Sequence, residues 1–399
     1  MSEQPGPSII FVVPESFATA NSGGRIRSFG IATALQTAGR LEVLALDDTA
    51  RADGWGEACR AFERRGRVLS RRLLDRARGA VRGNLRLLER MTAVGGVQAF
   101  GRILEATKAD VVVLSVPFFG PFVDAARARG ALVIADAHES LVRANRSILR
   151  SKAAPRVRLR AILDLQEARR FEPREYRRAD QVWVASAVEQ MHFAGTLPKA
   201  DIRVVPNLAP GQHRTDAAGP IRRIGFVGSY GYPPNEEAAL ALISSIAPAI
   251  RRRIGPIELV LIGRDPTPAM RRLAAAGEDI RITGTVPDAV ATLREAGILV
   301  VPLTAGAGSR IKILEAMQGG VPVVTTAAGL EGLAAEPGRE VLVAESPEAF
   351  AECVDRLRAN DAERDRLVAS ARVFVRTHHA QPAITAAVSE ALAGAARRR

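Results

Sequence analysis

The chain alternates short apolar runs with helix-period segments, and no other feature constrains its fold as strongly. The first run, SIIFVVP at 8–14, is apolar throughout, which is typical of a strand buried on both faces. Further runs of this kind occur in the first half at 41–46, 109–116, 131–138, 180–186 and 202–207. Because strands that alternate with helices form a parallel, doubly wound sheet, we predict an α/β fold.

The pattern is interrupted once and then restarts. Residues 208–220, LAPGQHRTDAAGP, are polar, contain Gly and Pro and have no periodicity, which indicates a linker. A second set of apolar runs follows, at 222–229, 257–263, 280–284, 298–303, 321–326 and 341–345. Helical patterns separate these runs too, so the second half predicts a second sheet of the same kind.

The length also favours two domains, because 399 residues exceed what a single hydrophobic core usually holds. We predict one Rossmann-like domain on each side of the linker, followed by a C-terminal helix that packs back toward the first domain. The predicted boundaries are 1–207 for the first domain, 208–220 for the linker, 221–376 for the second domain and 377–399 for the C-terminal helix.

A glycine-rich turn in the second half opens directly into a short helix, in the segment TAGAGSRIKILEAMQGGVPVV at 304–324. The first N–H groups of a helix have no intrahelical partner, and the helix dipole adds partial positive charge, so this turn suits a phosphate. Arg310 and Lys312 add two cations. The Glu315 carboxylate cannot bind phosphate but suits the hydroxyl pair of a ribose, although an acidic residue early in a helix also favours the dipole without a ligand. The segment predicts a nucleoside diphosphate site.

Glycine turns also follow the first strand of each half, at Gly23-Gly24 and from Gly228 to Gly231. In open parallel sheets, ligands bind outside the carboxyl ends of the strands. Two such sheets facing each other would form an interdomain cleft lined by both turns and by the segment 304–324. This convergence predicts an enzyme with two substrates.

Several strings resemble the family-4, or group 1, glycosyltransferases of the GT-B fold, which have two facing Rossmann-like domains. IGFVGS, ELVLIG, ITGTVPDAV and GAGSRIKILEAMQGGVPVV occur in the family's order in the second half. The string K-x-x-E-A-M-x-x-G-x-P-V-V, from Lys312 to Val324, is the most specific of them. In the first half, SGGRIRSF, the strand at 180–186 and VVPN at 204–207 resemble less specific landmarks.

The resemblance implies transfer of a sugar, with retention of anomeric configuration, from a UDP- or GDP-linked donor to a hydroxyl acceptor. The acceptor would be a glycan, a lipid-linked molecule or a small molecule, with cell-surface polysaccharide or glycolipid assembly as the setting. The second domain would hold the donor and the first domain the acceptor.

The resemblance also implies roles for individual residues. Glu315 would hold the ribose hydroxyls, and Arg310 and Lys312 would neutralise the departing diphosphate, to which the backbone at Gly308 and Ser309 would donate. Residues at the strand ends would complete the donor site. These are Gly23 and Gly24 beside the phosphates, Gly228 in the second glycine turn, and Gly263, Gly284 and Val286 around the base.

We expect neither a metal nor another cofactor. The two cations Arg310 and Lys312 can neutralise a leaving diphosphate. The sequence also has no D-x-D string, which is the usual metal-binding motif of the other main transferase fold. The sequence therefore predicts a metal-independent enzyme.

Two positions depart from the common pattern of the family. Ala307 stands where many members carry a glutamate that contacts the donor sugar, and Ser229, Tyr230 and Gly231 stand where a lysine is common. A subset of the family reads G-x-G-x-x-x-K-x-x-E, as residues 306–315 do here, and the chain resembles that subset. The donor sugar is left open, and Arg310 would compensate for the missing cation.

His138 is the strongest histidine candidate, because it follows a first-domain strand where the family often places a histidine that orients the donor sugar or the acceptor. The alternative is a strand-end histidine with satisfied hydrogen bonds. Asp136 and Glu139 would orient its ring or act on an acceptor hydroxyl, or would belong to an ordinary polar loop. The remaining histidines are expected at the surface: His192, His213, His378 and His379.

Positive charge is concentrated in two arginine-rich segments of the first half. Residues 60–90 carry eleven arginines against three acids, and residues 143–178 carry eleven arginines and Lys152 against four acids. Such segments suit an anionic membrane surface or a phosphorylated acceptor, but 52 arginines against 4 lysines also fit a general compositional bias. Arg25 and Arg27 could reach a phosphate or belong to the same surplus. Nucleic acid is not an expected partner, because the basic runs lack interleaved aromatic residues.

The sequence favours a cytoplasmic setting. It has only two cysteines, Cys59 and Cys353, and its N-terminus does not resemble a signal peptide. No apolar run approaches the roughly 20 residues that a membrane-spanning helix needs, so any membrane contact would be peripheral, at the inner face.

Other functions remain as alternatives. A transferase with a soluble small-molecule acceptor or a sugar-nucleotide epimerase would share the architecture. A dinucleotide-dependent oxidoreductase is disfavoured, because Gly225, Gly228 and Gly231 are spaced G-x-x-G-x-x-G and because IELVLIG ends in glycine where a ribose-binding acid is expected. The intact segment 304–324 argues against a non-catalytic scaffold.

Overall fold

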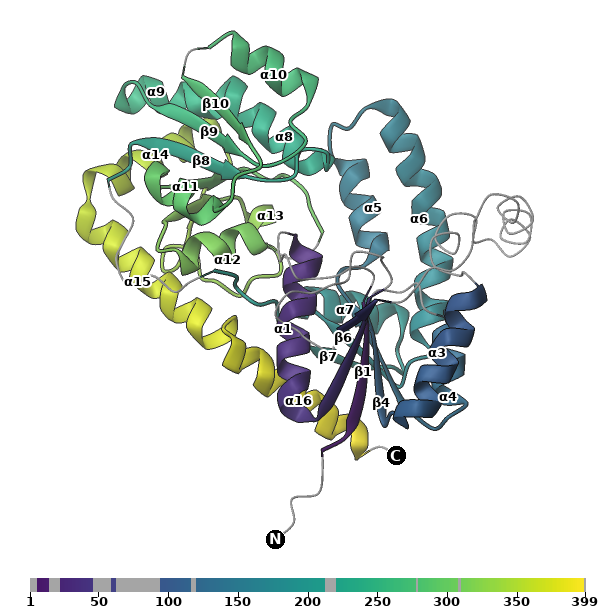
Figure 1. Ribbon diagram of the computed structural model, residues 1–399. Coiled ribbons are helices and arrows are strands. Elements are labelled where there is room, and N and C mark those ends of the chain that lie inside the picture. The colour runs from purple at the N-terminus through teal and green to yellow at the C-terminus, as the bar shows by residue number, and fades with distance from the viewer. Residues whose placement is uncertain are drawn as a thin grey trace. The chain divides into compact units, whose positions relative to one another are not determined.

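The computed structural model describes residues 6–13, 22–45, 59–61, 94–115, 120–211, 220–277, 279–307 and 310–397 (Figure 1). The chain divides into two compact units. The first comprises Met1–Val142, Leu163–Leu208 and Gln381–Arg399, and the second comprises Arg143–Ile162 and Ala209–Ala380. The change from one unit to the other after Leu208 lies within the predicted linker, of which residues 212–219 are outside the described part of the chain.

The first unit contains a seven-stranded sheet in the order β3-β2-β1-β4-β5-β6-β7, with every neighbouring pair parallel. Its strands are β1 (Ser8–Val13), β2 (Arg40–Ala45), β3 (Cys59–Ala61), β4 (Val111–Ser115), β5 (Leu132–Ala137), β6 (Gln181–Val184) and β7 (Asp201–Val204). All except β3 overlap predicted apolar runs, and β2 and β7 begin one residue before theirs. The sequence of β3, CRA, is too short and too polar to give that signal.

Helices connect these strands in the order that the sequence pattern predicts. They are α1 (Gly23–Ala38), α3 (Val94–Thr107), α4 (Gly120–Arg127), α5 (Leu141–Arg150), α6 (Pro155–Tyr176), α7 (Ala187–Thr196) and the C-terminal α16 (Gln381–Ala396). The arginine-rich segment 143–178 folds as α5 and α6, whereas the arginine-rich segment 60–90 lies outside the described residues beyond position 61.

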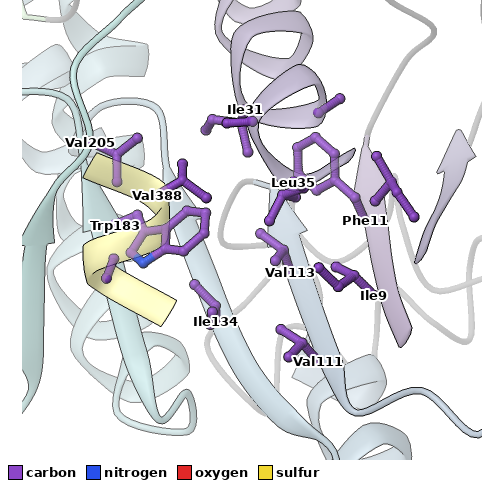
Figure 2. Close-up of a cluster of buried hydrophobic side chains, with 14 of the residues drawn as sticks. Ile9, Phe11, Ile31, Leu35, Val111, Val113, Ile134, Trp183, Val205 and Val388 are labelled. Carbon is purple, nitrogen blue, oxygen red and sulfur yellow. The ribbon is translucent and has the colours of Figure 1, made fainter. Parts of the chain in front are cut away.

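Side chains of β1 alternate between two buried clusters, one on each face of the first sheet. Ile9 and Phe11 join a cluster that includes residues of α1 and α16, and Ile10 and Val12 join a cluster with residues of α3 and α4. Figure 2 shows the first cluster, in which Trp183 lies beside Val388 of α16. Burial on both faces explains why the strand sequence is continuously apolar.

The last helix, α16, belongs to the first unit and packs against α1. The Gln181 side chain at the start of β6 donates to the Ala391 carbonyl over 3.1 Å, and the Gln381 side chain donates to the Gly30 carbonyl over 3.0 Å. These contacts join residues that are more than 200 positions apart in the sequence, so the C-terminal segment is part of the first unit's core.

The second unit contains a six-stranded sheet in the order β10-β9-β8-β11-β12-β13, again with parallel neighbours. The strands are β8 (Arg223–Val227), β9 (Glu258–Ile262), β10 (Ile280–Gly284), β11 (Leu299–Val301), β12 (Val323–Thr325) and β13 (Leu342–Val343). The sequence predicted all six. The α/β fold with two Rossmann-like sheets is therefore confirmed.

The helices of the second unit follow the predicted alternation. They are α8 (Pro233–Ala241), a π-helical stretch η2 (Leu242–Ile246), α9 (Ala247–Ile254), α10 (Pro268–Ala275), α11 (Ala289–Ala296), α12 (Ile311–Gln318), α13 (Ala327–Leu330), α14 (Pro347–Ala359) and α15 (Asp361–His378). Capping side chains set several helix starts: Thr267 and Asp288 accept from backbone N–H groups at the starts of α10 and α11.

Among the described residues, no helix combines the length and apolar character that crossing a bilayer requires. The predicted cleft between the two domains stays a prediction.

Candidate functional site

Three glycines lie together at the carboxyl ends of β8, β9 and β10. The Gly228 N–H donates to the Ile262 carbonyl over 3.0 Å, and the Gly263 N–H donates to the Gly284 carbonyl over 2.9 Å. Gly263 has a φ of +135°, and a Cβ atom there would overlap the Gly228 carbonyl oxygen, so only glycine fits. Val286 follows Gly284 by two residues and is half-buried. The strand ends thus present a backbone surface that a flat ligand group could approach closely.

Lys312 and Glu315 lie on the half-buried face of α12. Their three-residue spacing places them one turn apart on the same side of the helix. The residues that anchor the helix in the second unit are buried: Ile311, Ile313, Leu314, Ala316 and Met317. This pattern explains why a short helix can hold two charged side chains at fixed positions.

Lys312 is tied to the turn after β8. Its Nζ donates to Asn235 Oδ1 over 2.7 Å and lies 4.5 Å from the centre of the Phe226 ring. Asn235 in turn donates from Nδ2 to the Ser229 carbonyl over 2.9 Å. The segment 304–324 and the glycine turn after β8 are therefore joined by a hydrogen-bonded link. Sequence analysis did not single out Asn235 or Phe226.

The environment shifts the pKa values of Lys312 and Glu315 toward neutrality. Burial and, to a smaller extent, the neighbouring Arg310 lower the pKa of Lys312 to about 7, and Glu315 partly opposes the shift. Burial raises the pKa of Glu315 to about 7, with Lys312 opposing the rise and Asp288 adding to it. The charge on both groups therefore changes near neutral pH, which is common where side chains act on a ligand.

Arg310 is buried, with 6% of its surface exposed, and precedes the first residue of α12. Its Nη2 donates to the carbonyls of Gly306, over 3.0 Å, and Ala328, over 2.8 Å. Arg310 thus fastens the loop after β11 to α13, and its contact with a diphosphate stays a prediction. Gly308 and Ser309, which the resemblance assigns to the diphosphate, lie outside the described residues.

In the first unit, His138 belongs to a chain of polar contacts at the carboxyl ends of β4 and β5. Its Nε2 lies 2.6 Å from Ser115 Oγ and 3.3 Å from Asp136 Oδ2. Asp136 is fully buried. Burial alone would raise the pKa of Asp136, but the Arg27 guanidinium and His138 outweigh it and hold that pKa below its usual range. An ionised Asp136 is placed to orient the His138 ring.

The glycine turn of the first unit lies beside this histidine. The helix α1 begins at Gly23, with Ser22 as its N-cap. A Cβ atom on Gly24 would come within 3.3 Å of His138 Nδ1. Nε2 is hydrogen-bonded with Ser115 Oγ, and Nδ1 is the ring nitrogen nearest the glycine turn. The structure therefore brings Gly23, Gly24 and His138 together.

Arg27 is not available to reach a phosphate. It is 1% exposed, pairs with Asp136 Oδ1 at 2.6 Å, and donates to the Val205 carbonyl and to Asn207 Oδ1. The predicted alternative in which Arg27 reaches from the turn to a ligand is wrong, because the side chain points into the interior. It holds together the ends of β5 and β7 instead.

Two of the histidines expected at the surface are buried or nearly so. The His192 side chain is 13% exposed, and its Nε2 lies 2.9 Å from Ser140 Oγ. His379 is 7% exposed, and its carbonyl accepts from the Ala209 N–H. Sequence analysis missed them because their partners lie far away in the chain. His378 is exposed as expected, and His213 lies outside the described residues.

Comparison with known families gives a match over the second unit's candidate site. Residues 221–360 match the family model described as "Glycosyl transferases group 1". A phosphatidyl-myo-inositol mannosyltransferase from Mycobacterium leprae is 29% identical over 161 residues, which are 38% of this chain and 41% of that protein. The sequence likeness thus covers less than half of either chain. The matched family segment contains every described residue of the second unit's candidate site.

Solved structures match over nearly the whole chain. Sucrose-phosphate synthase from Thermosynechococcus elongatus has a TM-score of 0.72 at 17% identity, with 98% of this chain and all of that chain covered. Anabaena HepE in complex with UDP and glucose has a TM-score of 0.64 at 13% identity, with 97% of this chain and 99% of that chain covered. At this identity the likeness establishes the GT-B fold and leaves the substrates open.

Proposed function

We propose that this protein is a retaining glycosyltransferase that moves a sugar from a nucleoside diphosphate donor to a hydroxyl acceptor. The observation that carries the proposal is the link from Lys312 through Asn235 to the turn after β8, with Glu315 one turn further along the same face of α12, inside the segment that matches the group 1 family. A nucleotide needs these three elements together: a flat surface for the base, a carboxylate for the ribose and a cation for the diphosphate.

Each element has a chemical task in the proposed reaction. Glu315 accepts hydrogen bonds from the ribose hydroxyls and fixes the nucleotide on α12. Lys312, together with the backbone at Gly308 and Ser309, stabilises the diphosphate as it leaves. Because the leaving group gains negative charge in the transition state, fixed positive groups lower the barrier more than they tighten substrate binding. These protein groups suffice for the proposed chemistry without a metal.

His138 would act from the first unit. Ser115 and Asp136 hold its Nε2, so Nδ1 is free to donate to or accept from a sugar hydroxyl beside the Gly24 turn. The proposed task is orientation of the donor sugar or the acceptor, and Asp136 keeps the ring in one orientation for that task.

The donor proposed is a UDP- or GDP-linked hexose. The Anabaena structure contains UDP and glucose, and the Mycobacterium leprae relative is named a mannosyltransferase, so both fit a hexosyl donor. The donor test is thermal unfolding with UDP, GDP, ADP and NAD, because a ligand that binds the folded state raises the unfolding midpoint. A rise with UDP or GDP supports the proposal, and a rise with NAD alone contradicts it.

The acceptor is proposed to lie on an anionic membrane surface. Leu159, Ile162 and Leu163 are 61%, 43% and 50% exposed, and their i, i+3, i+4 spacing puts them on one face of α6. The same turns of the helix carry the exposed arginines Arg156, Arg158 and Arg160. Apolar side chains framed by cations suit the boundary between lipid headgroups and acyl chains. A glycan or lipid-linked acceptor would be reached from that surface.

A further inference from the structure

The two cations of the segment 304–324 both have partners within the protein. Lys312 already donates to Asn235, and Arg310 is buried against the carbonyls of Gly306 and Ala328. Ligands of parallel sheets lie over the turns that follow the strands. In the described residues of the turns after β8, β9, β10, β11 and β12, Arg264 is the only basic side chain besides Arg310.

The backbone fixes Arg264 against the turn after β8. Its carbonyl accepts from the Tyr230 N–H over 3.0 Å, which continues the pairing of β8 with β9 beyond the strands. The next residue, Asp265, adopts a left-handed φ of +59°, so the chain turns sharply there. Arg264 is therefore held directly next to Gly263, at the edge of the glycine surface.

The Arg264 side chain reaches over that turn. Its Nε donates to Ser229 Oγ over 3.2 Å and lies 3.7 Å from Asp265 Oδ2. The side chains of Arg264 and Asp265 are 58% and 64% exposed, and an ion pair so exposed contributes little to stability. These contacts orient the Arg264 guanidinium, and its exposed surface can still contact a ligand above the turn.

We propose that Arg264 binds the phosphoryl groups of the nucleotide from the turn after β9, with Ser229 orienting its guanidinium. The inference rests on the proposed function of this site and adds a binding residue to it. An arginine is suited to the contact because its planar fork can donate two parallel hydrogen bonds to phosphate oxygens. The turn after β8 itself supplies Ser229, Tyr230 and Gly231, none of which is a cation.

Calorimetric titration of the full chain tests the assignment. The ligands are the nucleoside diphosphate that stabilises the wild-type protein, the matching nucleoside monophosphate and the nucleoside. Arg264→Gln should weaken diphosphate binding about tenfold and leave nucleoside binding unchanged. The matched control is Arg272→Gln on α10, another exposed arginine, which should change neither affinity. Both variants should unfold at the wild-type temperature, because both side chains are at the surface.

A second variant tests the location of the contact. Adding Ser229→Lys to Arg264→Gln returns a cation to the same turn and should restore part of the lost diphosphate affinity. Wild-type diphosphate affinity in Arg264→Gln, an equal loss of nucleoside affinity, or no gain in the double variant would each overturn the inference while the proposed function stands. Failure of the wild-type protein to bind any nucleoside diphosphate would overturn both.

Discussion

Lys312 and Glu315 differ in their chemistry from ordinary surface side chains. Both are half-buried on one face of α12, and burial brings both pKa values to about 7. Such groups are poorly solvated in the folded protein, so keeping them charged costs folding free energy. This cost at two neighbouring residues supports the proposal that a ligand binds at α12.

Replacing Glu315 with glutamine should lower the rate of sugar transfer. Glu315→Gln keeps the shape of the side chain but weakens its hydrogen bonds to the ribose, so sugar transfer should fall about 10–100-fold. Initial rates with saturating acceptor measure the effect. The matched control is Glu295→Gln, at an exposed position on α11, which should retain wild-type rates. Full turnover by Glu315→Gln would exclude the assigned role.

The difference in stability between the wild-type protein and Glu315→Gln should depend on pH, because the pKa of Glu315 is raised in the folded protein. The pKa of Glu315 is 4.5 in the unfolded chain and about 7 in the folded protein. The free energy of unfolding of the wild-type protein should therefore fall as pH rises from about 4.5 to about 7, because only the unfolded chain releases the proton readily in this range. At pH 8, Glu315→Gln should therefore unfold about 2–4 °C above the wild-type protein, with the difference shrinking toward pH 4.5. Calorimetric scans across this range measure it, and a constant difference would argue against a shifted pKa.

The next prediction concerns the effect of Lys312 on the rate of sugar transfer. Lys312→Ala removes a cation from the departing diphosphate, so kcat should fall about 100-fold or more. Lys199→Ala, at an exposed lysine of the first unit, is the control and should be neutral. If Lys312→Ala altered only KM for the donor, Lys312 would bind ground state and transition state equally and the proposed stabilisation of the leaving group would be wrong.

At the scale of the elements, the sequence predicts regular structure better than it predicts contacts. Among the thirteen strands of the described residues, twelve overlap predicted apolar runs, and the signal is clearest in strands such as β1 and β4 that are buried on both faces. The start of α12 at Ile311 is also close to prediction, since the glycine-rich turn before it cannot continue as helix. The short strand β3 lacks any such signal.

The glycine surface at the ends of β8, β9 and β10 gives a stability prediction at this scale. Gly263→Ala should destabilise the protein by more than about 2 kcal/mol, because the new Cβ overlaps the Gly228 carbonyl and φ is positive. Gly255→Ala is the matched control: its φ is +85° but no atom lies within 4 Å of a Cβ, so it should lose only the backbone strain of about 1–3 kcal/mol and less than Gly263→Ala, which adds a clash. Denaturant unfolding compares them, and equal losses would mean that the backbone contact is unimportant.

The apolar and basic face of α6 gives a binding prediction. The wild-type protein should sediment with vesicles containing anionic lipid and remain in solution with neutral vesicles. Replacing Leu159, Ile162 and Leu163 with serine should abolish sedimentation, whereas Leu273→Ser, at a residue 42% exposed on α10, should not. Equal sedimentation with both kinds of vesicle would indicate that the arginines reflect composition and not a membrane surface.

At the scale of the whole molecule, the sequence predicts which strand ends carry a site but not which side chains meet there. Asn235 and Lys312 are 77 residues apart, and Arg27 and Asp136 are 109 residues apart. No local pattern reports such pairs, because their proximity depends on strand order. The same reason explains why Arg27 lies in the interior, why His379 is buried and why His192 is nearly so.

The sequence match to the family lies in one part of the chain only, and this fits the proposed division into donor binding and acceptor binding. The family match covers residues 221–360, the proposed donor-binding part, whereas the whole-chain likeness to solved structures is one of fold. A donor site must recognise a nucleotide that many enzymes share, while acceptors differ from one enzyme to another. The acceptor is therefore the part of the function that sequence likeness constrains least.

Slow hydrolysis of sugar nucleotides tests the central claim most directly, because it needs no acceptor. A panel of UDP- and GDP-hexoses is incubated with the wild-type protein and with Glu315→Gln, and the released nucleoside diphosphate and the anomer of the free sugar are followed by NMR. We predict that the wild-type protein hydrolyses at least one donor with retention of configuration and that Glu315→Gln hydrolyses it about 10–100-fold more slowly. Absence of hydrolysis with every donor, or equal hydrolysis by both proteins, would contradict a nucleotide-sugar site built on α12.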